Sequence, residues 1–176
     1  AERRDALVTS DAREALVERD LATPDDRKYA YAAVQSPEMD TAAYAFARAA
    51  VTGRLVQQLG LRAADLIAEV ERWALRSREL DPDFRGGAAT RLLGTLYVIA
   101  PGPLVAHGNS EQGIELLEEL VSEHPQVVEN QLRLAEGYIA LGDPDPAGPP
   151  LCACLAHREA LRRDSQRLLD QLLAAA

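Results

Sequence analysis

Proline and glycine divide the sequence into segments whose lengths suit helices. The segments 23–26 and 36–38 each place a Ser or Thr hydroxyl before a proline and an acid, an order typical of a helix start. Gly60, Pro82 and Gly142 stand where helical periodicity stops. Between these points apolar residues recur every three or four positions, and no run alternates with period two. The sequence therefore predicts an all-α fold without strands.

Eight helices are expected in one domain over 1–176, with N-terminal hairpins in 1–61 and a repeat-like region in 62–173. The expected helices cover about 11–21, 24–34, 37–59, 62–80, 87–99, 110–124, 126–141 and 151–173. The segments 100–108 and 143–150 are rich in proline and glycine and are predicted to be irregular. Short connections make neighbouring helices antiparallel, so four helical hairpins are the simplest arrangement.

A weak internal repeat narrows the fold further. Gly113, Leu117, Leu120 and Pro125 have the spacing of the second helix of a tetratricopeptide repeat, and Leu-Gly or Leu-Ala followed by Tyr fits its first helix. A small residue suits a close helix crossing, and the tyrosine fills the space beside it. The repeat predicts a right-handed superhelical stack with a core of Leu93, Gly94, Tyr97, Leu117, Leu120, Leu134, Ala135 and Tyr138. The alternative is a helical bundle whose spacing is coincidental.

The repeat spacing is broken at one place. Pro82 and Pro125 are about nine residues further apart than a 34-residue period allows. The excess is assigned to the segment 100–108, which we expect to be a functional elaboration on one face of the stack.

The central motifs carry a narrower resemblance. Phe-Arg-Gly-Gly at 84–87, Arg-Leu-Leu-Gly at 91–94, Pro-Gly-Pro at 101–103 and Gly108 resemble the signature of the TatT family, the T component associated with TRAP transporters. The similarity covers about 62–173. It implies a tetratricopeptide-like periplasmic lipoprotein that forms a trimer with a pore. It further implies a solute-binding protein as partner and an apolar or amphipathic ligand. The chain departs from the family in its proline-rich segment 143–150 and in lacking the lipid-anchoring cysteine.

Six candidate binding residues follow from the face of the first helices that lines the concave side of such repeats, namely Arg91, Thr95, Val98, Leu132, Glu136 and Ile139. Arg85, beside the double glycine, is the seventh candidate. Arg91 is interpreted either as an anchor for a carboxylate or as a structural bridge to Glu136. The double glycine at 86–87 lacks the Lys-Ser/Thr of a phosphate loop and is interpreted as a tight turn.

Other classes of function have little support in the sequence. A net charge of −9 without a basic stripe argues against nucleic acid and anionic membranes as partners, so membrane attachment would need a lipid anchor outside this chain. Cys152, Cys154 and His157 could be drawn as a metal site, but a helix would scatter them around its axis. We therefore expect reduced thiols and neither metal nor cofactor.

Three function hypotheses remain. The first is a non-enzymatic, periplasmic binding subunit of a TRAP-type transport system, for which the resemblance implies a trimer and a lipid anchor. The second is a generic tetratricopeptide adaptor, in the cytoplasm, that holds a peptide or helix of a partner protein. An enzyme with an all-α site is the least supported, because the three histidines lie in separate contexts.

Overall fold

The computed structural model describes residues 23–35 and 38–176, and these residues form α-helices, short 3₁₀ turns and loops without any strand. The prediction of an all-α fold is confirmed for this part of the chain. The α-helices are α2 (Pro24–Ala33), α3 (Ala42–Leu59), α4 (Ala64–Leu80), α5 (Ala88–Ile99), α6 (Ser110–Glu123), α7 (Val128–Ala140), α8 (Gly148–Ala156) and α9 (Arg163–Ala175). The helix predicted at 11–21 lies outside the described residues.

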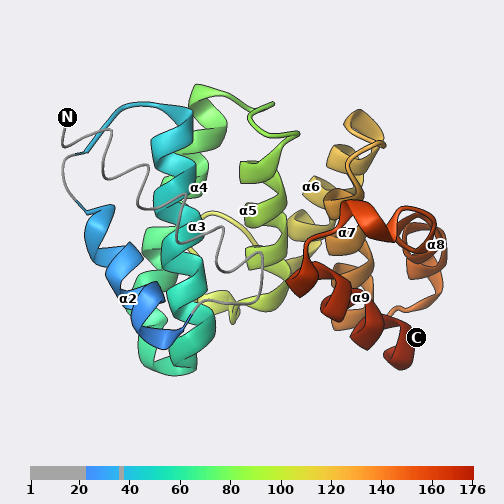
Figure 1. Ribbon diagram of the computed structural model, residues 1–176. Helices are drawn as coiled ribbons and strands as arrows, with labels where there is room; N and C mark the ends of the chain where they lie inside the picture. The colour runs from blue at the N-terminus through green and yellow to red at the C-terminus, as the bar shows by residue number, and fades with distance from the viewer. Residues whose placement is uncertain (1–22, 36–37) are drawn as a thin grey trace.

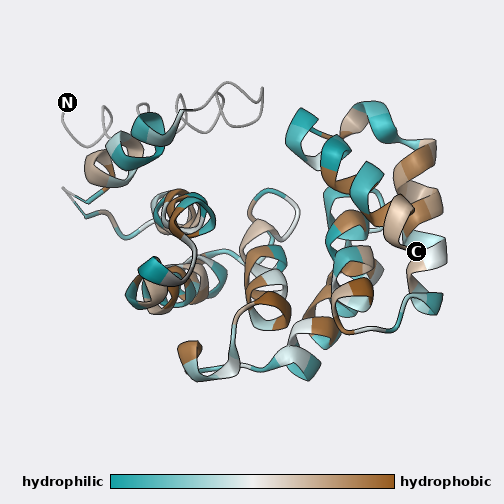
Figure 2. Ribbon diagram, turned by 90° about the horizontal axis from the view of Figure 1, so that it is seen from below, coloured by the Kyte–Doolittle hydropathy of each residue, from teal (hydrophilic) through white to brown (hydrophobic). Residues whose placement is uncertain are grey.

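The helices follow one another across the molecule in chain order, from α2 on one side to α8 and α9 on the other (Figure 1). The pairs α3/α4, α5/α6 and α7/α8 form hairpins, and α5 also packs against α7. Several helices show hydrophobic and hydrophilic residues side by side, as amphipathic helices do (Figure 2). The right-handed superhelical twist stays a prediction.

Side-chain caps define several helix starts. The Thr23 hydroxyl accepts a hydrogen bond from the Asp26 amide at 3.2 Å, and the Asp26 carboxylate accepts from the Thr23 amide in return. The predicted start of the third helix at 37 is wrong, because α3 begins at Ala42. Thr41 supplies its cap by accepting from the Tyr44 amide at 3.2 Å.

The C-terminal region differs from the single helix predicted over 151–173. It contains α8 and α9, separated by a 3₁₀ turn at Arg158–Ala160. The predicted irregular segment 143–150 is also partly wrong, because α8 begins at Gly148. Two prolines fit there, since the first helical turn needs no amide donors. Gln166 stabilises the turn by donating to the carbonyls of Arg158 and Leu161.

The hairpin α5/α6 is built on a close crossing of two glycines. A Cβ atom on Gly94 would lie 2.7 Å from Leu117 Cγ and 3.0 Å from the carbonyl oxygen of Gly113. A Cβ atom on Gly113 would lie 2.8 Å from the carbonyl oxygen of Gly94. The two backbones are therefore in contact, as the repeat pattern predicts for its small residues.

The predicted core is confirmed in all but one position. Residues buried as predicted are Leu93, Gly94, Tyr97, Leu117, Leu120, Leu134 and Ala135. Tyr138 is the exception, since it is only half-buried. Its hydroxyl donates to Glu118 Oε1 at 2.5 Å on the surface, which requires the end of the ring to reach the solvent.

We predict that Gly94→Ala lowers the free energy of unfolding. Overpacking against Leu117 and the Gly113 carbonyl costs about 1–3 kcal/mol, which outweighs the gain of up to about 1 kcal/mol in helix propensity. Gly53→Ala is the matched control, because Gly53 is also inside a helix but its Cβ would meet only Val70 Cγ1 at 4.0 Å. Denaturant titration followed by circular dichroism should show opposite shifts, and equal shifts would contradict the close crossing.

Candidate functional site

Arg91 is held by a buried amide rather than by a carboxylate. Its Nη1 donates to Asn130 Oδ1 at 2.6 Å, and Asn130 Nδ2 donates to the Gly86 carbonyl at 3.2 Å. Asn130 is fully buried at the start of α7. The two bonds join α5, α7 and the turn before α5. The predicted bridge between Arg91 and Glu136 is wrong, because Glu136 pairs with Arg133 on its own helix at 2.7 Å.

Arg91 lies among other charged groups. Burial lowers the pKa of Arg91 to about 10, with the carboxylate of Glu129 acting in the opposite direction and Arg133 and Arg162 lowering it further. A guanidinium with this pKa remains protonated at neutral pH. Arg91 is therefore a fixed, half-buried positive charge beside Asn130.

A charged face extends from Arg91 across four helices. Arg54 of α3 pairs with Asp164 of α9 at 3.0 Å. Arg162, just before α9, lies 3.9 Å from Asp164 and 3.7 Å from Glu129 of α7. We define the charged face as Arg54, Arg91, Glu129, Arg133, Glu136, Arg162 and Asp164, all of which are half-buried. Four arginines against three acids give this face a small positive charge on a chain of net charge −9.

The sequence placed the polar face of α7 three residues too far along the chain. It selected Leu132, Glu136 and Ile139, whereas the structure uses Glu129, Arg133 and Glu136. Leu132 is fully buried in a cluster with Leu151, Leu161 and Leu169, and Ile139 packs against the same cluster. These residues belong to the contact of α7 with α8 and α9. Glu129, Arg133 and Glu136 follow one another at intervals of four and three residues, and this spacing of charges is the sequence signal that could have located the face.

Thr95 and Val98 also make internal contacts. The Thr95 hydroxyl donates to the Arg91 carbonyl within α5 at 2.8 Å. Val98 packs toward α6 and α7, because its Cγ2 is 2.9 Å from the place of a Cβ on Gly113 and 3.7 Å from that on Gly137. Val98 and Leu132 therefore do not form an apolar lining at the charged face.

The segment 85–87 is a turn in which three successive residues have left-handed backbones. The φ angles are 51° at Arg85, 64° at Gly86 and 74° at Gly87. A Cβ on Gly87 would lie 2.2 Å from Leu120, so this turn packs directly on α6. Arg85 is exposed, with its guanidinium 5.3 Å from the centre of the Phe84 ring. The tight-turn interpretation of the double glycine is confirmed.

The insertion 100–108 is attached to the body of the protein through Glu71 of α4. This carboxylate is only 2% exposed and accepts from the amides of Ala106 and His107, both at 2.8 Å. A Cβ on Gly108 would lie 2.3 Å from the ring of Tyr97, so the end of the insertion packs against α5. The connection 81–87 is also longer than the connection 124–127, so the excess in repeat spacing is not confined to 100–108.

The pKa of Glu71 is lowered by its contacts with the insertion. Burial raises the pKa of this carboxyl, but the amides of Ala106 and His107 favour the charged form and outweigh burial. The stability that Glu71 contributes is therefore complete above the unfolded-state pKa of about 4.3 and is lost as the pH falls through the folded-state value.

The remaining reactive side chains lie apart. His107, in the connection between α5 and α6, has its Nδ1 3.5 Å from Glu71. His124, directly after α6 and therefore at the other end of this hairpin, has its Nε2 3.2 Å from Asp83. Cys152 is exposed and Cys154 is buried, which confirms that the helix directs the two thiols apart. Among the described residues no group of three or more His, Cys, Asp or Glu could hold a metal ion. Within the same part of the chain, no helix has the length and hydropathy required to cross a bilayer.

No protein-family model matches this chain, and no curated protein matches its sequence.

We predict that Glu71→Ala releases the insertion. The change removes the charged acceptor that two backbone amides share and should lower the free energy of unfolding by about 1–3 kcal/mol. Hydrogen exchange at the amides of Ala106 and His107 should accelerate. Glu79→Ala is the control on the same helix, because its exposed ion pair with Arg76 should contribute no more than about 1 kcal/mol. Unchanged exchange at 106 and 107 in Glu71→Ala would contradict this attachment.

Proposed function

We propose that this protein is a non-enzymatic binding subunit of the tetratricopeptide type and that its partner contacts the charged face. The observation that carries the proposal is the gathering of four arginines and three acids on α3, α5, α7 and α9. A mixed, half-buried set of charges of this kind suits a polar partner surface or a carboxylate.

The resemblance to TRAP transporter T components suggests the partner. On this proposal the chain is periplasmic and binds the solute-binding protein of a TRAP system, an amphipathic ligand, or both. Support comes from the glycines of the resembling motifs, because Gly86, Gly87, Gly94 and Gly108 each have a steric reason in the packing around α5. The trimer and the lipid anchor implied by the same resemblance stay predictions.

A generic adaptor is the second candidate. Arg133 and Arg162 could bind the acidic end of a peptide or helix without any transport system. The two candidates share the charged face and differ in the partner that it recognises.

We predict that Arg91 and Arg133 have separable roles. Arg91→Ala leaves the buried Asn130 amide without its donor and should lower the free energy of unfolding by about 1–3 kcal/mol. Arg133→Ala removes a half-buried pair on the helix surface and should cost no more than about 1 kcal/mol. Thermal and denaturant unfolding of both variants would test this difference, and equal losses would contradict it.

We predict further that Arg133 contributes to partner binding. Isothermal titration calorimetry with the TRAP solute-binding protein of the source organism should show binding that Arg133→Ala weakens about tenfold or more, the loss of one charge-assisted bond. Arg76→Ala is the control, since Arg76 is an ion-paired arginine on α4 outside the charged face. No binding by the wild-type chain would contradict the transport proposal. Arg133-dependent binding of acidic peptides instead would favour the adaptor.

A further inference from the structure

Among the described residues, Arg91 is the one arginine of the charged face that has no acid as a partner. The other three arginines of the face each pair with one of its three acids. Within residues 23–35 and 38–176 the guanidinium of Arg91 forms no ion pair, and its only hydrogen bond goes to the neutral amide of Asn130. The excess positive charge of the face is therefore located at Arg91.

This arrangement is unfavourable for a charge that is partly removed from water. Burying a guanidinium costs free energy unless an opposite charge compensates it. Arg91 is half-buried, and burial is the largest cause of its lowered pKa. The like charges of Arg133 and Arg162 lower this pKa further, against the longer-range attraction of Glu129. The position lacks one negative charge, as expected of a binding site without its ligand.

Two hydrogen bonds fix the direction of the Arg91 guanidinium. Its Nη1 donates to Asn130 Oδ1 at 2.6 Å, and Asn130 Nδ2 donates to the Gly86 carbonyl at 3.2 Å. The Nε–H bond and one Nη2–H bond of a guanidinium are parallel and lie on the same edge. Neither has an acceptor in the part of the chain that the structure describes. Arg91 therefore presents two parallel donors, the fork that a carboxylate accepts with both oxygens.

We propose that the Nε–Nη2 edge of Arg91 is a subsite for one carboxylate group of the molecule that the charged face binds. The inference rests on the proposed function and names the chemical group that is recognised. A carboxylate carries one negative charge, which balances four arginines against three acids. A phosphate carries close to two charges and would leave an excess of negative charge.

An arginine elsewhere in the chain shows this contact completed internally. Arg158 donates from Nη1 and Nη2 to the two oxygens of Asp170, at 2.7 and 2.8 Å. Arg91 is more buried than Arg158, so it has more need of such a partner, and its surroundings in the described chain supply only an amide. The missing carboxylate is therefore expected from a ligand.

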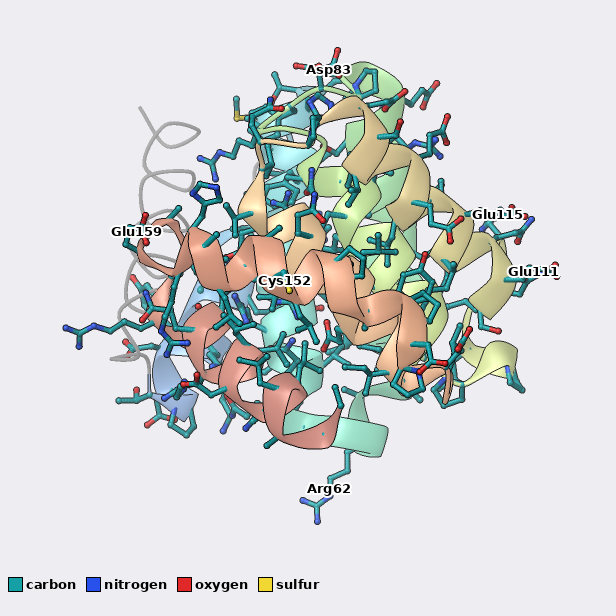
Figure 3. The ribbon with its side chains drawn as sticks, turned by 90° about the vertical axis from the view of Figure 1, so that its right-hand side faces the viewer. Arg62, Asp83, Glu111, Glu115, Cys152 and Glu159 are labelled. Atoms are coloured by element: carbon teal, nitrogen blue, oxygen red, sulfur yellow. The ribbon has the colours of Figure 1, made fainter. Side chains whose placement is uncertain are left out.

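The distribution of charge makes the position of Arg91 distinct. The chain has a net charge of −9, and α6 alone carries five exposed glutamates. Two of them, Glu111 and Glu115, project outward from α6 in Figure 3. Anions are therefore repelled from much of the surface, whereas the charged face attracts them.

Sodium acetate is the probe for the subsite, because it is a carboxylate with almost no other surface. Magnetic resonance of the isotope-labelled wild-type protein follows the Nε–H signals of its arginines. A ligand held by one charge-assisted contact should bind with a Kd of about 5–100 mM. The Arg91 signal should shift to saturation with acetate and not with sodium chloride. The Arg158 signal should not shift. An Arg91 signal that stays in place, or that responds equally to chloride, would overturn the proposal.

Arg91→Lys tests the fork. Lysine keeps the positive charge and a donor for Asn130 but has no pair of parallel N–H bonds. Acetate binding, followed by the side-chain amide signal of Asn130, should weaken about fivefold or more. Arg158→Lys is the matched control and should leave the Kd unchanged. Circular dichroism checks that both variants fold, and the wild-type titration decides alone if Arg91→Lys does not. Equal Kd values for wild type and folded Arg91→Lys would overturn the bidentate subsite.

Two short acetylated alanine peptides separate the sources of the carboxylate, one with a free C-terminus and one with a C-terminal amide. If the acid binds about tenfold more tightly than acetate and the amide does not bind, the group belongs to the end of a polypeptide. Equal affinities of the acid and acetate indicate a small organic acid. Equal binding of acid and amide, or tighter binding of inorganic phosphate than of acetate, would overturn the choice of a carboxylate.

These results are independent of the test of the proposed function. If acetate shifts the Arg91 signal while neither the solute-binding protein nor acidic peptides bind, the proposed function fails and the subsite remains. If a partner binds in an Arg133-dependent way while acetate leaves Arg91 unaffected, the subsite alone is refuted.

Discussion

The contact between the backbones of α5 and α6 at Gly94 and Gly113 is the constraint on which the centre of the molecule depends. Because neither residue has a Cβ, Leu117 can fill the space beside Gly94, and Val98 can reach between α6 and α7. The same close approach brings the turn 85–87 onto Leu120. If a methyl group pushed α5 and α6 apart, the contacts of Leu117, Val98 and Leu120 could not all be kept, since protein interiors tolerate little change in volume.

Two buried polar side chains then fix the segments that interrupt the repeat. Asn130 connects Arg91 to the Gly86 carbonyl, and Glu71 accepts from two amides of the insertion. Both give backbone groups of these segments a side-chain partner. The two irregular segments are therefore held from opposite sides, by α7 and by α4. Their positions are specific although their sequences are rich in glycine and proline.

The sequence was a good guide wherever one signal dominated. Helix class, the glycine crossing and most of the core follow from apolar spacing and small residues, which act locally. It was a poor guide where two structures satisfy the same signal. The prolines at 149 and 150 suit a loop and equally the first turn of α8. Leu132 suits a binding surface until α9 covers it, and the sequence does not show where α9 packs. The partners of Arg91 and Glu71 are 39 and 35 or 36 residues away, beyond the reach of any local pattern.

The charged face and the outer side of α8, whose exposed residues are Gly148, Pro149, Cys152, Leu155 and Ala156, differ in the charge that they present to a partner. The charged face has seven ionised side chains, of which six lie in ion pairs with one another and Arg91 donates to Asn130, so a partner there must offer comparable charge to replace bonds that already exist. The outer side of α8 has no ionised side chain, so contact there costs no desolvation of charge and depends on apolar area. A partner chosen by the first surface is poorly suited to the second.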